Sequence, residues 1–201
     1  MKQVENLLSE TSLEALRSLK GEKLVAIFTD NRWLRDGAFV SFVVRTEVGD
    51  VIAELHDEGF RHPLVYDPIT NSYDITLMTV RRCTRSETEG RIGDIIHPDK
   101  TRIPLHRRAH RIGKRIERVV VLLENFWAND PRENPDAPVD LPEEDWVYVR
   151  EPRAIALVLE DETLLFDKGG LGWGTIWDIT RTPGKELRLP EDFTDYEAID
   201  L

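Results

Sequence analysis

A cluster of cations stands near the middle of the chain and is the strongest local charge in the sequence. Residues 102–118 carry a charge of +6, because Glu117 is the only acid against Arg102, Arg107, Arg108, Arg111, Lys114, Arg115 and Arg118. If the segment is helical, Arg107, Arg111, Lys114 and Arg118 line one side, and such a stripe can contact phosphates or an acidic protein surface. No aromatic residues that could stack on bases are interleaved with these arginines. We therefore place nucleic acid second to a protein surface, which includes this protein's own acidic segment at 128–145.

That acidic segment, ANDPRENPDAPVDLPEED, is the second feature with clear chemistry. It has four prolines and no apolar period, which predicts an exposed loop. Trp146 follows directly, and a second tryptophan, Trp173, stands in a glycine-rich stretch; both suit an exposed aromatic anchor. The predicted partner-binding residues are Asp136, Asp140, Glu143, Glu144, Asp145, Trp146 and Trp173.

The histidines do not form a convincing metal site. His106 and His110 are four residues apart, a spacing that can bind a metal on a helix, but no glutamate of a metalloprotease motif stands between them. The neighbouring cations would repel a divalent ion. We interpret both histidines as polar residues on a solvated basic face and predict no metal site.

Two further motifs are also weak. The glycines at 169, 170, 172 and 174 fall between two expected strands, whereas a phosphate-binding loop needs a following helix. Cys83 stands among arginines that could lower the pKa of its thiol, yet no histidine or asparagine partner motif accompanies it. We predict a hairpin connection, a strand-end cysteine, no catalytic residues and no cofactor.

Composition narrows the class of protein. The 201 residues carry a net charge of −11, which disfavours a general binder of nucleic acid or anionic membranes. A single cysteine excludes an intrachain disulfide and favours a reducing compartment. No apolar run is long enough to span a bilayer, and the first residues lack the apolar region of a secretory signal. These features predict a cytoplasmic protein with no membrane segment.

A weak internal echo indicates how the chain is organised. Residues 25–33, VAIFTDNRW, resemble 119–127, VVVLLENFW, so that Trp33 and Trp127 occupy matching positions, which we expect in the core or at its rim. Residues 42–47 likewise resemble 157–162, and 63–68 resemble 174–179. Three apolar segments in the same order, twice, predict two similar β units that bury a shared core.

The remaining patterns complete the predicted fold. A short N-terminal helix is expected before residue 21, with Thr11 and Glu14 as its capping box and Gly21 as its stop. A second helix is expected over 104–116, where Leu105, Ala109, Ile112 and Ile116 form one stripe. The fold class is α+β, mostly β, with two antiparallel units in one domain. The expected order is a first unit at 22–83, loop and basic helix at 84–117, a second unit at 118–180 and an acidic tail at 181–201.

The sequence favours a non-catalytic, cytosolic protein-binding function. An acidic chain without catalytic motifs suits a protein that neutralises a basic partner, as bacterial immunity proteins neutralise toxins. One alternative is a nucleic-acid-associated protein that uses residues 102–118. The other is an enzyme whose site has no linear motif, formed between the two β units.

Overall fold

Strands dominate the architecture. The computed structural model describes residues 2–29, 41–60, 75–92, 95–96, 102–103, 112–127, 142–169, 176–189 and 196–201, and the statements below concern these ranges. The elements in chain order are β1 (Lys2–Glu5), α1 (Glu10–Arg17), β2 (Lys23–Thr29), β3 (Ser41–Thr46), β4 (Asp50–Phe60), β5 (Ile75–Cys83), α2 (Arg85–Ile92), β6 (Ile95–Ile96), β7 (Arg102–Ile103), β8 (Lys114–Trp127), the 3₁₀ turn η1 (Glu143–Asp145), β9 (Val147–Leu159), β10 (Glu162–Gly169), β11 (Ile176–Pro183) and β12 (Tyr196–Asp200). The prediction of a mostly β fold is confirmed.

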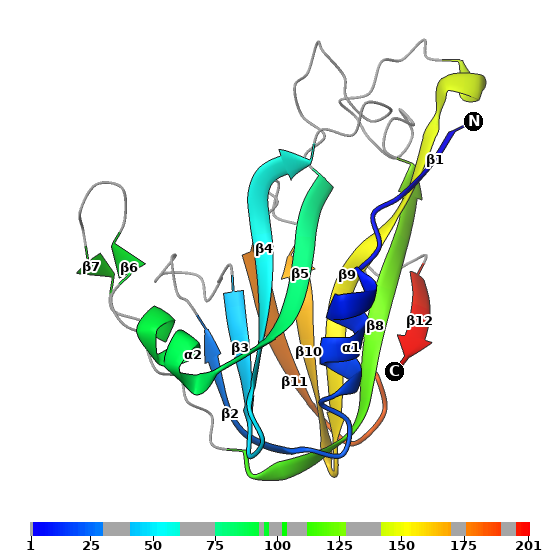
Figure 1. Cartoon of the computed structure of the whole chain (residues 1–201). Helices are drawn as coiled ribbons and strands as arrows, with labels where there is room; N and C mark the ends of the chain where they lie inside the picture. The colour runs from blue at the N-terminus through cyan, green and yellow to red at the C-terminus, as the bar shows by residue number, and fades with distance from the viewer. Residues whose placement is uncertain are drawn as a thin grey trace.

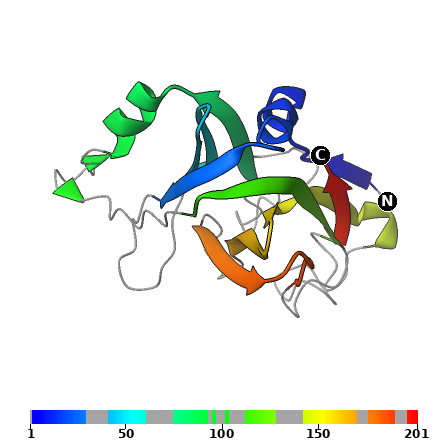
Figure 2. The same cartoon turned by 90° about the horizontal axis from the view of Figure 1, so that it is seen from below.

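One 10-stranded sheet holds most of the strands, in the order β11-β10-β9-β8-β2-β3-β4-β5 (Figure 1). β1 adds to β9 in parallel. β12 adds to β8 in antiparallel orientation, like the other pairings in this sheet. β6 and β7 form a separate two-stranded sheet. The sheet curls, so that the β2–β5 half and the β9–β11 half lie on either side of β8 when seen from below (Figure 2).

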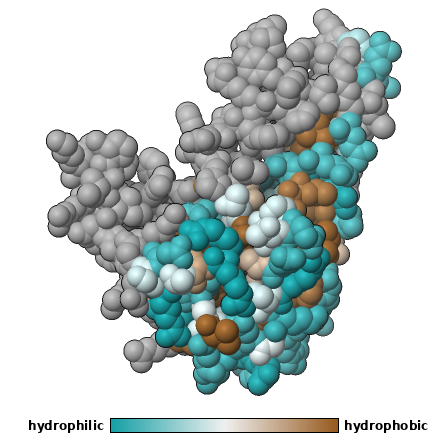
Figure 3. Space-filling view, viewed as in Figure 1, coloured by the Kyte–Doolittle hydropathy of each residue, from teal (hydrophilic) through white to brown (hydrophobic). Residues whose placement is uncertain are grey.

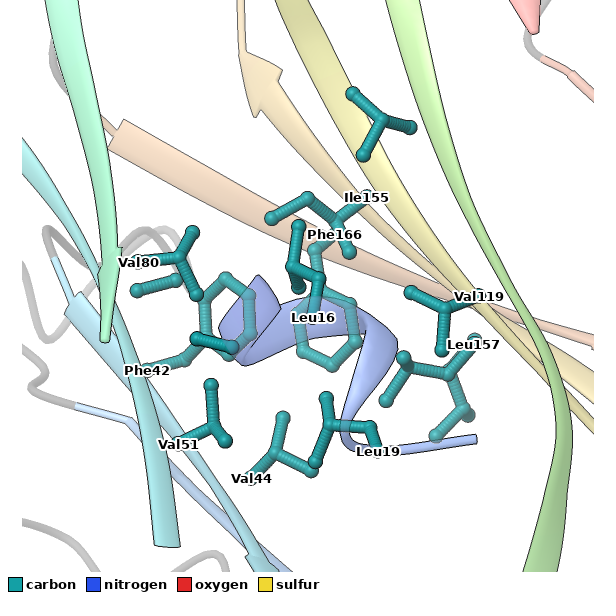
Figure 4. Packing of buried hydrophobic residues seen from close by; sticks show 14 of the residues in the cluster. Leu16, Leu19, Phe42, Val44, Val51, Val80, Val119, Ile155, Leu157 and Phe166 are labelled. Atoms are coloured by element: carbon teal, nitrogen blue, oxygen red, sulfur yellow. The ribbon is translucent and has the colours of Figure 1, made fainter. Parts of the chain in front are cut away.

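The two halves share one apolar interior. The rings of Phe42 on β3 and Phe166 on β10 stack with centroids 4.0 Å apart, and Trp177 on β11 meets Phe42 edge-on at 5.0 Å. Leu16 and Leu19 reach between the halves from α1 and the turn after it (Figure 4). Buried aromatic contacts of this kind add to the free energy that area burial alone supplies.

β8 is apolar on both of its faces because both are covered. Val119, Val121 and Leu123 belong to the shared interior. Val120 and Leu122 point the other way, where Leu187 and Leu189 from the segment after β11 pack against them. A strand buried on both faces loses the polar alternation of a half-exposed one, which accounts for the continuous run VVVLL.

Helix α1 lies beside β5 and is tied to it by polar contacts. The helix is capped by Ser9, whose hydroxyl accepts from the backbone N–H of Ser12 at 3.2 Å. The hydroxyl of Ser12 in turn accepts from the backbone N–H of Val80 on β5, also at 3.2 Å. The N-cap is therefore Ser9, two residues before the predicted Thr11. Residues 2–5 form a strand where the apolar pattern continued into the expected helix.

The predicted basic helix does not extend to residue 116. Gly113 has a φ of +67°, and Lys114 to Ile116 already belong to β8. A left-handed glycine followed by a run of β-branched residues favours a strand start over a helix end. Residues 104–111 of that prediction lie outside the described ranges.

Helix α2 lies where the sequence was interpreted as loop. The backbone N–H of Glu87 donates to the Thr84 hydroxyl at 3.3 Å, and the Glu87 carboxylate accepts from the Thr84 backbone N–H at 2.8 Å. These two bonds are a reciprocal capping box. The Thr84 backbone N–H and the Thr84 hydroxyl, which both donate to the Glu87 carboxylate, lower the pKa of Glu87 below its ordinary value of 4.5. Strand β12 was similarly missed in the acidic tail.

The internal echo corresponds to equivalent places in the topology. Residues 25–33 begin in β2 and 119–127 lie in β8, and each strand opens a run of successive antiparallel neighbours, β2 to β5 and β8 to β11. Segments 42–47 and 157–162 include most of β3 and the end of β9. Trp33 and residues 63–68 lie outside the described ranges, as does the side chain of Trp127. The duplication itself remains a prediction.

Candidate acidic contact surface

The described part of the acidic segment is a short turn that leads into β9. Pro142, Glu143 and Glu144 are exposed, and Trp146 is half-buried. The Trp146 backbone N–H donates to the Glu143 carbonyl at 3.2 Å, which closes the 3₁₀ turn η1. We call residues 142–146 the acidic turn.

The acidic turn stands on a rigid base. Val147, the next residue, is buried with Val149 and Val4 in a small cluster, with Phe126 packed against it. Val147 also pairs with Lys2 of β1, while β8 lies on the other side of β9. A surface held by buried strand residues pays little ordering entropy when a partner binds.

The chemistry of the turn suits contact with a cationic surface. No cation of the described residues lies within ion-pair distance of Glu143. An exposed carboxylate beside a partly buried indole combines charge attraction with an aromatic area that a partner can desolvate. Asp145 belongs to the turn, although its side chain is not described. Asp136, Asp140 and Trp173 lie outside the described ranges.

The cations at the start of β8 have a different environment. Lys114 Nζ lies 2.6 Å from Asp161 and 2.8 Å from Glu162, both at the hairpin between β9 and β10. The hydrogen bonds to these two carboxylates raise the pKa of Lys114 above its ordinary 10.5. Lys114 is thus held by acids of its own chain.

The next cations along β8 are also engaged within the protein. Arg118 lies 2.6 Å from Asp200 of β12, and the Arg115 guanidinium donates to the Gly21 carbonyl at 3.2 Å. Each contact joins residues far apart in sequence. Arg107 and Arg111, the other two predicted members of the basic stripe, lie outside the described ranges.

Glu162 is the centre of a buried charge cluster that sequence patterns did not reveal. Its side chain is 6 % exposed and is bound by both Lys114 and Arg181. Burial alone would raise the pKa of Glu162, but the hydrogen bonds and charges of Arg181 and Lys114 outweigh it and lower the pKa below 4.5. The hydrogen bond between Arg181 and Glu162 also raises the pKa of Arg181. The cluster fixes the start of β8 to the β10–β11 pair.

A second buried pair, Lys168 with Glu151, was also missed. The Lys168 ammonium donates to Glu151, and the two side chains are 8 % and 7 % exposed. The Asn6 amide donates to the other Glu151 oxygen at 3.4 Å. The alternation of β10 offered a signal, because Lys168 follows Leu164 and Phe166 at every second position, on the interior face.

A third buried charge, Asp50, has a structural role. Arg45 donates to both oxygens of Asp50, at 3.0 and 2.8 Å, and the Thr88 hydroxyl donates to it at 2.5 Å, so the cluster ties α2 to the β3–β4 hairpin. The Cys83 thiol donates to the Asp50 carbonyl at 3.6 Å, as expected of a strand-end cysteine.

Metal, membrane and family comparisons give no further assignment. Within the described ranges, no group of His, Cys, Asp and Glu side chains is arranged to hold a metal ion, and no helix has the length and hydropathy to cross a bilayer. Comparison with known proteins found no matching family model, no matching curated protein and no matching solved structure. The surface of the described residues in the view of Figure 3 is mostly hydrophilic, broken by small hydrophobic areas.

Proposed function

We propose that this protein is a non-catalytic binding protein that neutralises a basic protein partner, with the acidic turn and Trp146 at the contact. The observation that carries the proposal is the exposure of the turn. Glu143 and Glu144 are exposed in a turn that also holds the half-buried Trp146. The strand that follows this turn is anchored in the sheet through the buried Val147 and Val149. An immunity-like protein needs this combination of attraction, an aromatic anchor and a rigid base.

The overall charge supports the same partner class. Segment 128–145 holds seven acids against Arg132, a net charge of −6, within a chain of net charge −11. A cationic partner would be attracted over about a Debye length, roughly 8 Å at physiological salt, and the attraction would speed its encounter with the turn. Specificity would then come from desolvating Trp146.

The nucleic-acid alternative gains less support from the contacts. Lys114 is held by Asp161 and Glu162, and Arg118 by Asp200. A phosphate would have to displace these carboxylates, so each new contact would cost an existing ion pair. The enzyme alternative gains no support from the described residues, whose three buried charge clusters are all paired internally.

The test is capture of bound molecules from the native cells. The tagged protein is purified at low salt, with and without nuclease, beside the variants E143K/E144K and E160K/E186K. Glu160 and Glu186 are also exposed, so both variants change the net charge equally. We expect a stoichiometric basic protein that survives nuclease, is kept by E160K/E186K and is lost from E143K/E144K.

Other results would overturn the proposal. Nucleic acid that disappears with nuclease or added salt would favour the basic segment instead. A protein retained equally by both variants would remove the acidic turn as the contact. Absence of any bound molecule from all three samples would contradict a binding function and direct attention to substrate screening.

A further inference from the structure

Strand β1 lies at an edge of the sheet, and its outer side is open. It pairs with β9 on one side, and among the described residues no strand pairs with its other side. The Asn6 backbone N–H donates to the Arg150 carbonyl at 2.9 Å. Successive residues of a strand turn their backbone groups to opposite edges, so the N–H and C=O groups of Gln3 and Glu5 point away from β9. We call these backbone groups the open edge.

The edge of β5, by contrast, is covered by the protein itself. The Val80 backbone N–H donates to the Ser12 hydroxyl of α1 at 3.2 Å, and Arg82 donates to the Ser18 hydroxyl at 2.7 Å. Within the described ranges, no comparable contact reaches the backbone of the open edge. Because an exposed strand edge invites pairing with other chains, proteins usually block it. An edge that stays open beside a proposed contact surface is therefore a candidate part of that surface.

The charges around the open edge are negative. Segments 3–10 and 142–146 hold five acids and no lysine or arginine. The Glu5 side chain is 49 % exposed and lies 3.6 Å from Arg150, which also binds Glu197, so one cation is shared by two carboxylates. A second copy of this edge would bring like charges together, whereas a cationic strand would match them.

Apolar side chains stand at both ends of the open edge. The alternation of exposed and buried residues in β1 continues to Leu7, which is 41 % exposed. At the other end, Lys2 pairs with Val147, so the acidic turn with Trp146 lies beside the start of β1 (Figure 1). A strand laid along this edge would find hydrogen bonds in the middle and apolar contacts at its ends.

We propose that the basic partner adds an extended segment to the open edge of β1, with a lysine or arginine against Glu5 and an apolar side chain against Leu7. The backbone hydrogen bonds of Gln3 and Glu5 supply affinity, and the side chains on alternate positions supply specificity. This proposal rests on the proposed function, because it names the part of the partner that binds beside the acidic turn.

The test follows the exchange of backbone amides with water by NMR of the full chain at low salt. The probe is a short synthetic peptide of alternating lysine and valine. Its control is the same peptide methylated at every backbone nitrogen, which keeps the charge but blocks close approach of the two backbones. We expect the first peptide to slow exchange of the Gln3 and Glu5 amides saturably, and the methylated peptide to leave both unchanged.

Two proline variants test the edge through its backbone without changing the charge. Gln3→Pro removes an outward N–H, which an edge strand tolerates. Ala198→Pro makes the same change on β12: the Leu201 N–H donates inward to the Val119 carbonyl at 2.9 Å, so by alternation the Ala198 N–H points outward. We expect Gln3→Pro to weaken peptide binding about tenfold and Ala198→Pro less than about twofold, with both variants melting like wild type.

The contrary results separate this proposal from the proposed function. Unchanged exchange at Gln3 and Glu5, equal slowing by both peptides, or equal weakening by the two prolines would each overturn the open edge as a binding site. Loss of the captured protein from E143K/E144K with full retention by Gln3→Pro would also overturn it and leave the acidic turn as the contact. Capture of no protein, with the peptide still bound along β1, would overturn the proposed function alone.

Discussion

The start of β8 and the turn before β9 carry opposite charges, and their charged side chains have different surroundings. At the start of β8, Lys114 and Arg118 are matched by acids from β12 and from the β9–β10 hairpin. In the acidic turn, Glu143 and Glu144 are exposed. A charge cluster in a sequence therefore says little about binding until its internal partners are known, because those partners come from distant strands.

The largest effect is expected at Glu162, where the internal matching is tightest. Glu162→Ala leaves Lys114 and Arg181 without their shared carboxylate. We expect a loss of about 2 to 3 kcal/mol in the free energy of unfolding, below the roughly 3 to 5 of a fully buried pair because both cations are partly exposed. Urea denaturation measures it. Glu160→Ala, an exposed neighbour, should change stability by less than about 0.5 kcal/mol.

In the acidic turn, Trp146 is expected to be the main anchor for the partner. Trp146→Ala should weaken binding of the captured partner by about 2 kcal/mol, roughly thirtyfold, because an interface aromatic loses both area and packing. Isothermal titration measures the affinity. Trp146→Phe should restore most of it, and an alanine variant that binds like wild type would remove Trp146 from the contact.

A smaller effect is expected in the pH dependence of stability, and it concerns Glu162. The pKa of Glu162 is lower in the folded protein than its ordinary 4.5, so its contribution is present above that pH and is lost as the pH falls through the folded-state pKa. We expect the stability difference between wild type and Glu162→Gln to shrink below pH 4.5. Thermal melts across that range test it, and a constant difference would contradict the assigned role.

The smallest effect is expected at the exposed pair of Arg118 and Asp200. Both side chains are about half exposed, so Arg118→Gln should cost about 0.2 to 1 kcal/mol, and less at high salt. Chemical denaturation at two salt concentrations measures it. Binding of a short DNA duplex that falls sharply in the same variant would show that Arg118 serves phosphates rather than Asp200.

The sequence predicted much of the β framework but little of the charge pairing. The apolar segment expected at 25–33 begins in β2, and the apolar run at 119–123 indicated a buried strand. The helix over 104–116 was mispredicted at its end because Ile112 and Ile116 fit a helical stripe, whereas Gly113 and the valines that follow favour a strand. The capping box of Thr84 and Glu87 was visible in the sequence and would have indicated α2.

The buried clusters could not have been predicted in the same way. Glu162 meets Lys114 across 48 positions of the chain, and Asn6 meets Glu151 across 145. Such pairs depend on which strands the sheet brings together, and local patterns do not specify that order. The exposure of Glu143 and Glu144 was predicted because its signal, prolines and acids next to a tryptophan, is local. The partner contact at this turn stays a prediction.

The most direct test of the central claim is the affinity of the captured partner for three proteins as salt is varied. These are wild type, E143K/E144K and E160K/E186K, each checked for an unchanged melting temperature. The account predicts that E143K/E144K binds about tenfold or more weakly and with a flatter salt dependence, while E160K/E186K stays near wild type. Equal weakening in both variants would show that only net charge matters and would contradict a contact at the acidic turn.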